Sequence, residues 1–115
     1  MVRILVAEDD EGMRSLIARV LREHVLNLVS SYDEAVRLIR ASADGWDVAV
    51  LDGAIPLPRE GELLAGFLRK RFPGIKVVSC SSAPQLWGDR NISKSSEDVA
   101  KALPAAVNEV LSRSS

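Results

Sequence analysis

Three carboxylates in this chain of 115 residues stand directly after runs of mostly apolar residues. Glu8 and Asp9 follow residues 3–7, and the third, Asp52, follows residues 46–51. A charge at the end of a buried segment is costly unless it is solvated, paired or bound to a metal. Mg²⁺ prefers oxygen ligands and removes the repulsion between neighbouring carboxylates. We therefore expect Asp9 and Asp52 to bind Mg²⁺ directly, while Glu8 holds a metal-bound water.

A carboxylate can also attack phosphorus and form an aspartyl phosphate, and Asp52 is the candidate nucleophile. The backbone carbonyl of Ala54 could complete the metal site. Catalysis of phosphoryl transfer consists mostly of positioning and charge neutralisation. The ammonium group of Lys94 could neutralise phosphoryl oxygens, and the hydroxyl of Ser81 could donate a hydrogen bond to one of them. Each of these residues taken alone is more typical of a turn or a solvated surface, so the prediction depends on their conjunction.

The elements that must position these residues alternate along the chain. Strands are predicted at the apolar runs 3–7, 25–29, 46–51 and 75–80, with a possible fifth at 91–93. Apolar residues recur at helical spacing near 13–21, 35–39, 63–68 and 99–110. Alternating strands and helices predict a parallel sheet with helices on both faces. Ligands of such sheets bind outside the carboxyl ends of the strands, so the polar side chains should meet at one edge.

Local signals mark the ends of the predicted helices. Asp10 or Glu11 can begin the first helix, because carboxylates favour the positive end of a helix. Ser31 and Glu34 have the spacing of a capping box, in which the serine caps the helix and the glutamate reaches back. Gly45 can take the left-handed turn that ends this second helix.

Composition limits the classes of function. Apolar residues make up 47% of the chain and charged residues 27%, which fits one globular domain over residues 1–115. The net charge of −1 gives no electrostatic reason to expect binding to nucleic acid or to an acidic membrane. The single cysteine, Cys80, excludes an internal disulfide and is expected to lie in the core. No apolar stretch reaches the roughly 18 residues that span a membrane, and no signal peptide is visible, so we expect a cytoplasmic protein.

These motifs together resemble the receiver domain of bacterial two-component response regulators. "ILVAEDDEGMR" is similar to the first strand and acidic pair of that family, and "WDVAVLDGAIP" to its phosphoacceptor strand and loop. "VVSCSSA" is similar to the strand that ends in the hydroxyl residue, here Ser81, and "ISKSS" to the segment that carries the lysine, here Lys94. The resemblance covers most of the chain.

The resemblance implies a fold and a function. The fold is an α/β, flavodoxin-like, doubly wound sheet of five parallel strands in the order 2-1-3-4-5. Asp52 would accept a phosphoryl group from a histidine kinase or a phosphotransfer protein with Mg²⁺ present, and a downstream protein target could read the change. Such a domain is a signalling partner, so we do not expect an enzyme.

The chain departs from the family between the fourth and fifth strands. Only twelve residues separate Ser81 from Lys94, and they include Pro84 and Gly88 without helical periodicity. A parallel crossover with its helix usually needs a dozen or more residues. We therefore expect the helix between these strands to be missing or reduced to about one turn. Trp87 in this segment is expected to cover the sheet left bare, or alternatively to anchor a partner.

Two further positions differ from the family pattern. Asn91 stands where the family has an aromatic residue that moves on activation, and Ser95 stands where a proline usually follows the lysine. Pro104 falls inside the last amphipathic pattern, so that helix is expected to kink or to start late. The phosphorylation chemistry therefore looks retained while the usual output surface looks rebuilt.

Two other functions stay open from the sequence. The first is a receiver-like module that docks to other proteins and does not switch. The second is a small phosphatase or nucleotide-binding enzyme on a similar sheet. Against this enzyme class, no second carboxylate follows Asp52 two positions later, and the chain has no G-x-x-x-x-G-K-[ST] phosphate loop. The sequence does not predict an oligomeric state.

Overall fold

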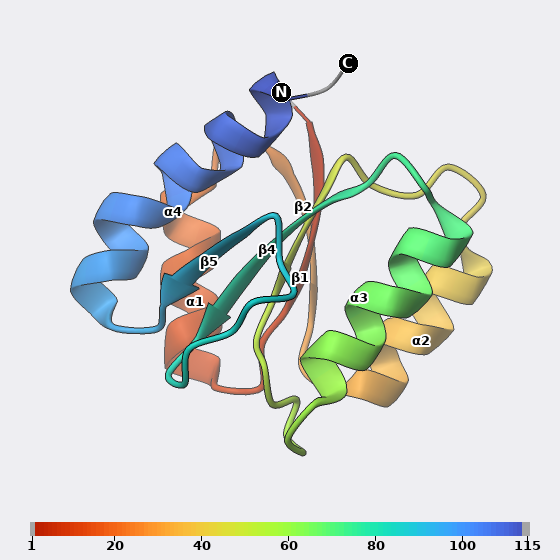
Figure 1. Cartoon of the computed structure of the whole chain (residues 1–115), viewed down its shortest axis with the longest axis horizontal. Coiled ribbons are helices and arrows are strands. Elements are labelled where there is room, and N and C mark those ends of the chain that lie inside the picture. Colours follow the sequence, from red (N-terminus) through yellow and green to blue (C-terminus); the bar gives the residue numbers. More distant parts are fainter. Residues whose placement is uncertain (1, 114–115) are drawn as a thin grey trace.

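The computed structural model describes residues 2–113 and contains one sheet of five strands in the order β2-β1-β3-β4-β5 (Figure 1). The strands are β1 (Arg3–Ala7), β2 (Val25–Val29), β3 (Val48–Leu51), β4 (Lys76–Ser81) and β5 (Arg90–Ser93). Every neighbouring pair is parallel. The predicted flavodoxin-like α/β fold and its strand order are therefore confirmed.

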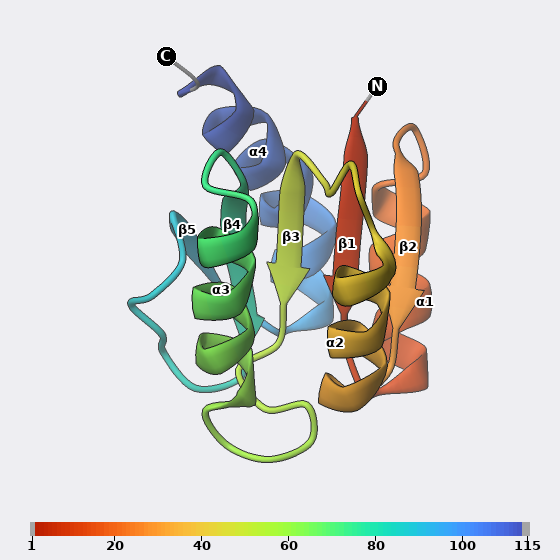
Figure 2. The ribbon, with the colours of Figure 1, turned by 90° about the vertical axis from the view of Figure 1, so that its right-hand side faces the viewer.

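Helices form a layer on each face of the sheet (Figures 1 and 2). The helices α1 (Glu11–Val20) and α4 (Ser96–Ser112) cover one face. The helices α2 (Tyr32–Ala41) and α3 (Glu60–Arg71) cover the other. Because side chains alternate along a strand, β3 supplies both layers: Val48 and Val50 belong to the core beside α1 and α4, whereas Ala49 and Leu51 belong to the core beside α2 and α3. All four are buried, which accounts for the uninterrupted apolar run.

The helix signals of the sequence have visible partners. Asp10 caps α1, its Oδ2 accepting a hydrogen bond from the backbone N–H of Met13 at 2.7 Å. Ser31 caps α2 by accepting from the N–H of Glu34 at 3.1 Å. The Glu34 carboxylate reaches back as predicted, although it accepts from the N–H of Ser30, one residue before the cap. Gly45 has the left-handed backbone (φ 71°) expected after α2, and Cys80 is buried in the core.

The segment between β4 and β5 contains no helix in the part of the chain that the structure describes. Residues 82–89 form an irregular loop beside β5, the last strand of the sheet, and Figure 1 shows it as the teal segment between β4 and β5. Trp87 is half-buried and packs against the core beside α2 and α3. The missing helix was predicted, and Trp87 covers the face that such a helix would otherwise occupy.

Some boundaries differ from the sequence prediction. The third strand begins at Val48, two residues later than predicted, and Ser81 is the last residue of β4. The last helix does not start late: Ser95 caps it by accepting from the N–H of Asp98 at 3.1 Å. Helix α4 also runs uninterrupted through Pro104. Buried apolar residues on both sides of the proline hold the two halves against the sheet and offset the one lost backbone hydrogen bond.

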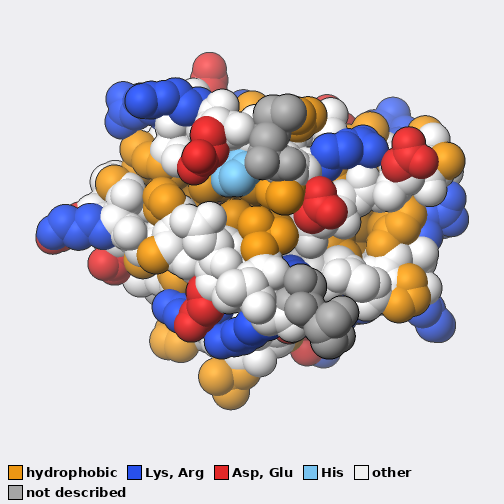
Figure 3. All heavy atoms as spheres, turned by 90° about the horizontal axis from the view of Figure 1, so that it is seen from above, with side chains coloured by type: hydrophobic (Ala, Val, Ile, Leu, Met, Phe, Trp, Pro, Cys, Tyr) orange, Lys and Arg blue, Asp and Glu red, His pale blue; other side chains and the backbone are white. Residues whose placement is uncertain are grey.

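The surface carries charges of both signs. Figure 3 views the end of the molecule where both termini lie, and there basic and acidic side chains are interspersed around apolar ones. Among residues 2–113, no helix combines the length and the apolar character that crossing a bilayer requires.

Candidate functional site

Asp52 lies directly after β3, at the edge of the sheet opposite the termini. Its backbone N–H donates to the carbonyl of Ala7 at 3.0 Å, which continues the pairing with β1. Its side chain is 5% exposed, and Oδ1 accepts a hydrogen bond from the N–H of Ala54 at 3.3 Å. The first turn of α3 packs on the same backbone, because the N–H of Gly61 donates to the carbonyl of Gly53 at 3.1 Å. Strand and helix together fix the carboxylate in place.

Lys94 contacts two carboxylates at once. Its Nζ lies 2.7 Å from Oδ2 of Asp52 and 2.8 Å from Oε2 of Glu8. The lysine follows β5, and its backbone N–H donates to the carbonyl of Ser81 at 3.1 Å, so the parallel pairing of β4 and β5 brings it to this edge. An ammonium group between two largely buried carboxylates provides the charge compensation that burial demands.

Burial and this pairing change the protonation of the site. Burial raises the pKa of Glu8 to about 7, and the nearby charge of Asp52 adds to this, although hydrogen bonds from Lys94 and from the N–H of Asp10 oppose it. For Lys94, burial favours the neutral amine, but its hydrogen bonds and attraction to Asp52 and Glu8 outweigh burial and raise its pKa. The lysine is therefore charged at neutral pH.

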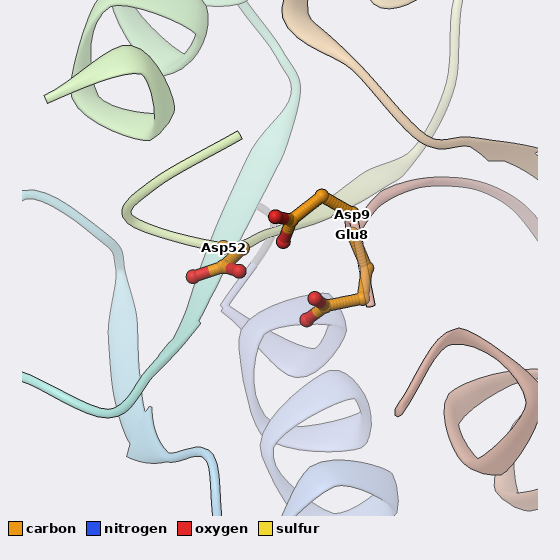
Figure 4. Close-up of side chains that lie close together, drawn as sticks. All are labelled: Glu8, Asp9 and Asp52. Atoms are coloured by element: carbon orange, nitrogen blue, oxygen red, sulfur yellow. The ribbon is translucent and has the colours of Figure 1, made fainter. Parts of the chain in front are cut away.

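Three carboxylates converge beside the lysine. Oxygen atoms of Glu8, Asp9 and Asp52 lie within 4.8 Å of one another, and Figure 4 shows the three groups turned toward a common space. Asp9 is exposed, whereas Glu8 is 1% exposed and its Oε1 is buried without a hydrogen-bond partner. A cation is one group that can satisfy such a buried oxygen, besides a water or a proton, and an all-oxygen donor set suits Mg²⁺. The residues present therefore fit the predicted metal.

A hollow of about 450 Å³ opens over this group. Its walls include the predicted residues Asp9, Asp52, Ala54, Ser81 and Lys94, with Glu8 beneath Lys94. The structure thus brings all six sequence-predicted site residues to one edge. Their roles stay predictions: the direct ligation by Asp9 and Asp52, the water held by Glu8, the carbonyl ligand from Ala54, and the phosphoryl contacts of Ser81 and Lys94.

Sequence reasoning missed several residues of this site, among them Arg14 and Gln85. Arg14 donates from Nη1 to the backbone carbonyl of Glu8 at 2.9 Å and so supports the acidic loop from the first helix. Its position one turn into that helix, within "EDDEGMR", was an available signal. Gln85 lines the hollow beside Ser81 and Asp52. It lies in the irregular loop, where no periodicity indicates the direction of a side chain.

No model of a protein family matches the chain, and neither does any curated protein. Solved structures do match it. The response regulator TrrA from Thermotoga maritima, in complex with Mg²⁺–BeF, is 23% identical with a TM-score of 0.80, over 96% of this chain and 99% of that one. The receiver domain of the Francisella response regulator 1452 is also 23% identical, with a TM-score of 0.77 over the full length of both chains.

NtrX from Brucella abortus is 21% identical with a TM-score of 0.77, over 98% of this chain. The match covers 26% of NtrX, so this chain spans about a quarter of that protein's length. The chain thus has the fold of a response-regulator receiver domain, as its motifs indicated. At these identities the likeness establishes the fold, and the chemistry must be argued from the site.

Proposed function

We propose that this chain is a phosphoacceptor receiver domain of a two-component system, in which Asp52 takes a phosphoryl group from a histidine kinase or a phosphotransfer protein. One observation carries the proposal: Asp52 lies at the edge of a hollow, held by Lys94 at 2.7 Å and adjoined by the carboxylates of Glu8 and Asp9. The TrrA neighbour was solved with Mg²⁺–BeF, which supports the same chemistry for this edge of the fold.

The transfer would use groups that are already in place. A carboxylate oxygen of Asp52 forms a bond to phosphorus while the bond from phosphorus to the donor's imidazole nitrogen breaks, and the electron pair leaves with that nitrogen. Lys94 neutralises negative charge on the transferred group, and the Ser81 hydroxyl donates to one of its oxygens. Mg²⁺, when bound by Asp9 and Asp52 with Glu8 nearby, adds positive charge at the phosphoryl oxygens.

The proposed role is that of a signalling partner, with no turnover of small substrates. The proposed partners are a histidine kinase or phosphotransfer protein upstream and a protein target downstream, with a cytoplasmic location. We do not propose binding to nucleic acid, because the chain has a net charge of −1.

Intact-mass measurement after incubation with acetyl phosphate and Mg²⁺ tests the proposal. The wild-type chain should gain one phosphoryl group, which hydroxylamine should remove because it is an acyl phosphate. Asp52→Asn should gain none. Asp44→Asn is the matched control, since Asp44 is an exposed aspartate away from this hollow, and it should behave as the wild type. Equal labelling of Asp52→Asn would show that the acceptor is elsewhere.

A non-switching docking module is the second candidate. The helix-free connection between β4 and β5 favours it, because this is the segment in which the chain departs from the family pattern. A folded wild-type chain that gains no phosphoryl group would support this candidate. The phosphatase alternative predicts turnover of p-nitrophenyl phosphate, and on the proposed function we expect none.

A further inference from the structure

Gln85 connects the hollow at Asp52 to Trp87. Its Nε2 lies 3.2 Å from the carbonyl oxygen of Ala83 and 3.5 Å from Oγ of Ser81. On the other side, its Oε1 accepts a hydrogen bond from Nε1 of Trp87 at 2.6 Å. One carboxamide therefore contacts both a hydroxyl of the site and the indole of the loop.

The chemistry of the partners fixes the orientation of this carboxamide. A backbone carbonyl can only accept a hydrogen bond, and an indole N–H can only donate one. The amide nitrogen of Gln85 must therefore face Ala83 and Ser81, while its oxygen faces Trp87. With Nε2 as donor to the Ser81 oxygen, the hydroxyl proton of Ser81 stays free to donate into the hollow.

The carboxamide of Gln85 lies close to Gly53, the residue that follows Asp52. A Cβ placed on Gly53 would lie 2.9 Å from Nε2 of Gln85 and 2.8 Å from Oγ of Ser81, so a larger side chain there would displace these two side chains. Gln85 thus packs beside the residue that follows Asp52. At 3.5 Å the contact from Gln85 to Ser81 is at the outer limit of a hydrogen bond, so a small displacement of Oγ strengthens or breaks it.

The far end of the loop is anchored. Arg69 on α3 donates from Nη1 to the carbonyl of Trp87 at 2.8 Å and forms an ion pair with Asp89. Asp89 accepts from the backbone N–H of Val77 at 2.7 Å. Residues 87–89 are therefore tied to α3 and β4, whereas Leu86 just before them is 94% exposed. A displacement of the Ser81 side chain would therefore act first on the carboxamide of Gln85, which it contacts, and through that carboxamide on the indole of Trp87.

We propose that Gln85 is a positioning residue of the phosphoryl site: it orients the Ser81 hydroxyl toward an oxyanion on Asp52 and transmits occupancy of that site to the Trp87 indole. This inference rests on the proposed function. When an oxyanion draws Oγ of Ser81 toward it, the distance from Oγ to Nε2 changes. The carboxamide of Gln85 turns in response, and the hydrogen bond from Nε1 of Trp87 to Oε1 of Gln85 changes length. The output of the site is then local to residues 81–87.

The indole N–H resonances of the folded protein test this directly, because the chain has two tryptophans. Beryllofluoride with Mg²⁺ serves as the probe, and fluorine NMR of the bound probe measures occupancy separately. We expect the Trp87 resonance, assigned with Trp87→Phe, to shift by more than its linewidth at full occupancy. Trp46, which lies just before β3, is the internal control. Its Nε1 donates to Oδ1 of Asn27 on β2, and its resonance should not shift.

Variants at the site separate a relay from a structural role. Gln85→Met has a similar length but neither donor nor acceptor, so it should bind the probe more weakly, and at full occupancy its Trp87 resonance should no longer respond. Ser81→Ala breaks the connection from the other side and should also abolish the response. Leu86→Ala, a change at an exposed neighbouring side chain, should respond as the wild type.

The outcomes distinguish the inference from the function beneath it. Bound probe with a wild-type Trp87 shift that Gln85→Met abolishes supports the relay. Bound probe with no Trp87 shift, or with the same shift in Gln85→Met, overturns the relay and leaves the phosphoacceptor function intact. Folded wild-type protein that shows no bound probe overturns both.

Discussion

Lys94 reaches across 42 sequence positions to place its ammonium nitrogen 2.7 Å from Oδ2 of Asp52. This contact joins the end of β5 to the end of β3, although β4 lies between them in the sheet. The same ammonium also contacts Glu8 after β1. One side chain therefore supplies positive charge to carboxylates from two different strands.

Replacing Lys94 by methionine should destabilise the metal-free protein by about 3 kcal/mol, because two carboxylates exposed by only 1% and 5% would lose their counter-charge. Urea unfolding in EDTA measures this. Lys101→Met is the matched control: its ion pair with Glu97 is 3.0 Å long but lies in solvent, so its loss should cost about 0.5 kcal/mol or less. Equal losses in the two variants would show that the Lys94 contacts do not stabilise the fold.

The stability of the metal-free protein should fall as the pH rises. Burial raises the pKa of Glu8 from 4.5 to about 7, so the folded state holds this proton more tightly than the unfolded chain. The resulting contribution is fully present below pH 4.5 and is lost as the pH rises through about 7. Urea midpoints at about pH 5.5 and about pH 8 should show a smaller decrease in Glu8→Gln than in the wild type, since the amide does not titrate. An identical pH dependence in the two proteins would contradict this assignment.

Mg²⁺ should raise the melting temperature, because a ligand that binds only the native state adds stability, about 2.7 kcal/mol at a concentration one hundred times its Kd. Asp9→Asn should reduce the increase, since it removes one of the three clustered carboxylates. Asp44→Asn again serves as the control and should keep it. If the wild-type melting temperature does not move in millimolar Mg²⁺, or if both variants respond alike, the cluster is not the metal site.

The location of the site was predictable because its residues follow strands. Asp52 and Glu8 end apolar runs, and the rule that parallel strands align their carboxyl ends brings them together whatever the loops do. The missing helix was predictable from the same kind of reasoning, since the chain between Ser81 and Lys94 is too short for one. Both inferences use only segment lengths and the pattern of apolar and polar residues, which are read directly from the sequence.

Other features depended on tertiary contacts that sequence patterns do not contain. The path of α4 through Pro104 rests on buried neighbours that offset one missing hydrogen bond. The direction of Gln85 is set by Trp87 and by the absence of a side chain at Gly53, and none of the three lies in a periodic segment. The position of Gln85 in the site could therefore not be predicted, because it lies in an irregular loop.

Two glycines of α3 should respond oppositely to the same substitution. A Cβ on Gly61 would lie 2.0 Å from the backbone carbonyl oxygen of Asp52, whereas one on Gly66 would meet no atom within 4 Å. Gly61→Ala should therefore push α3 away from the backbone of Asp52 and lower the free energy of unfolding by about 2–3 kcal/mol, as overpacking does. Gly66→Ala should stabilise the protein by about 1 kcal/mol, because alanine favours a helix interior.

Two measurements test this contact between α3 and Asp52. Urea unfolding gives the stability of each variant, and the rate of phosphoryl uptake from acetyl phosphate gives its effect on the proposed function. Gly61→Ala, kept under conditions where it is folded, should also take up the phosphoryl group more slowly, since the backbone that positions the Asp52 carboxylate is displaced. Gly66→Ala should take it up at the wild-type rate. Gly61→Ala with wild-type stability and uptake would mean that the close approach of α3 does not position Asp52.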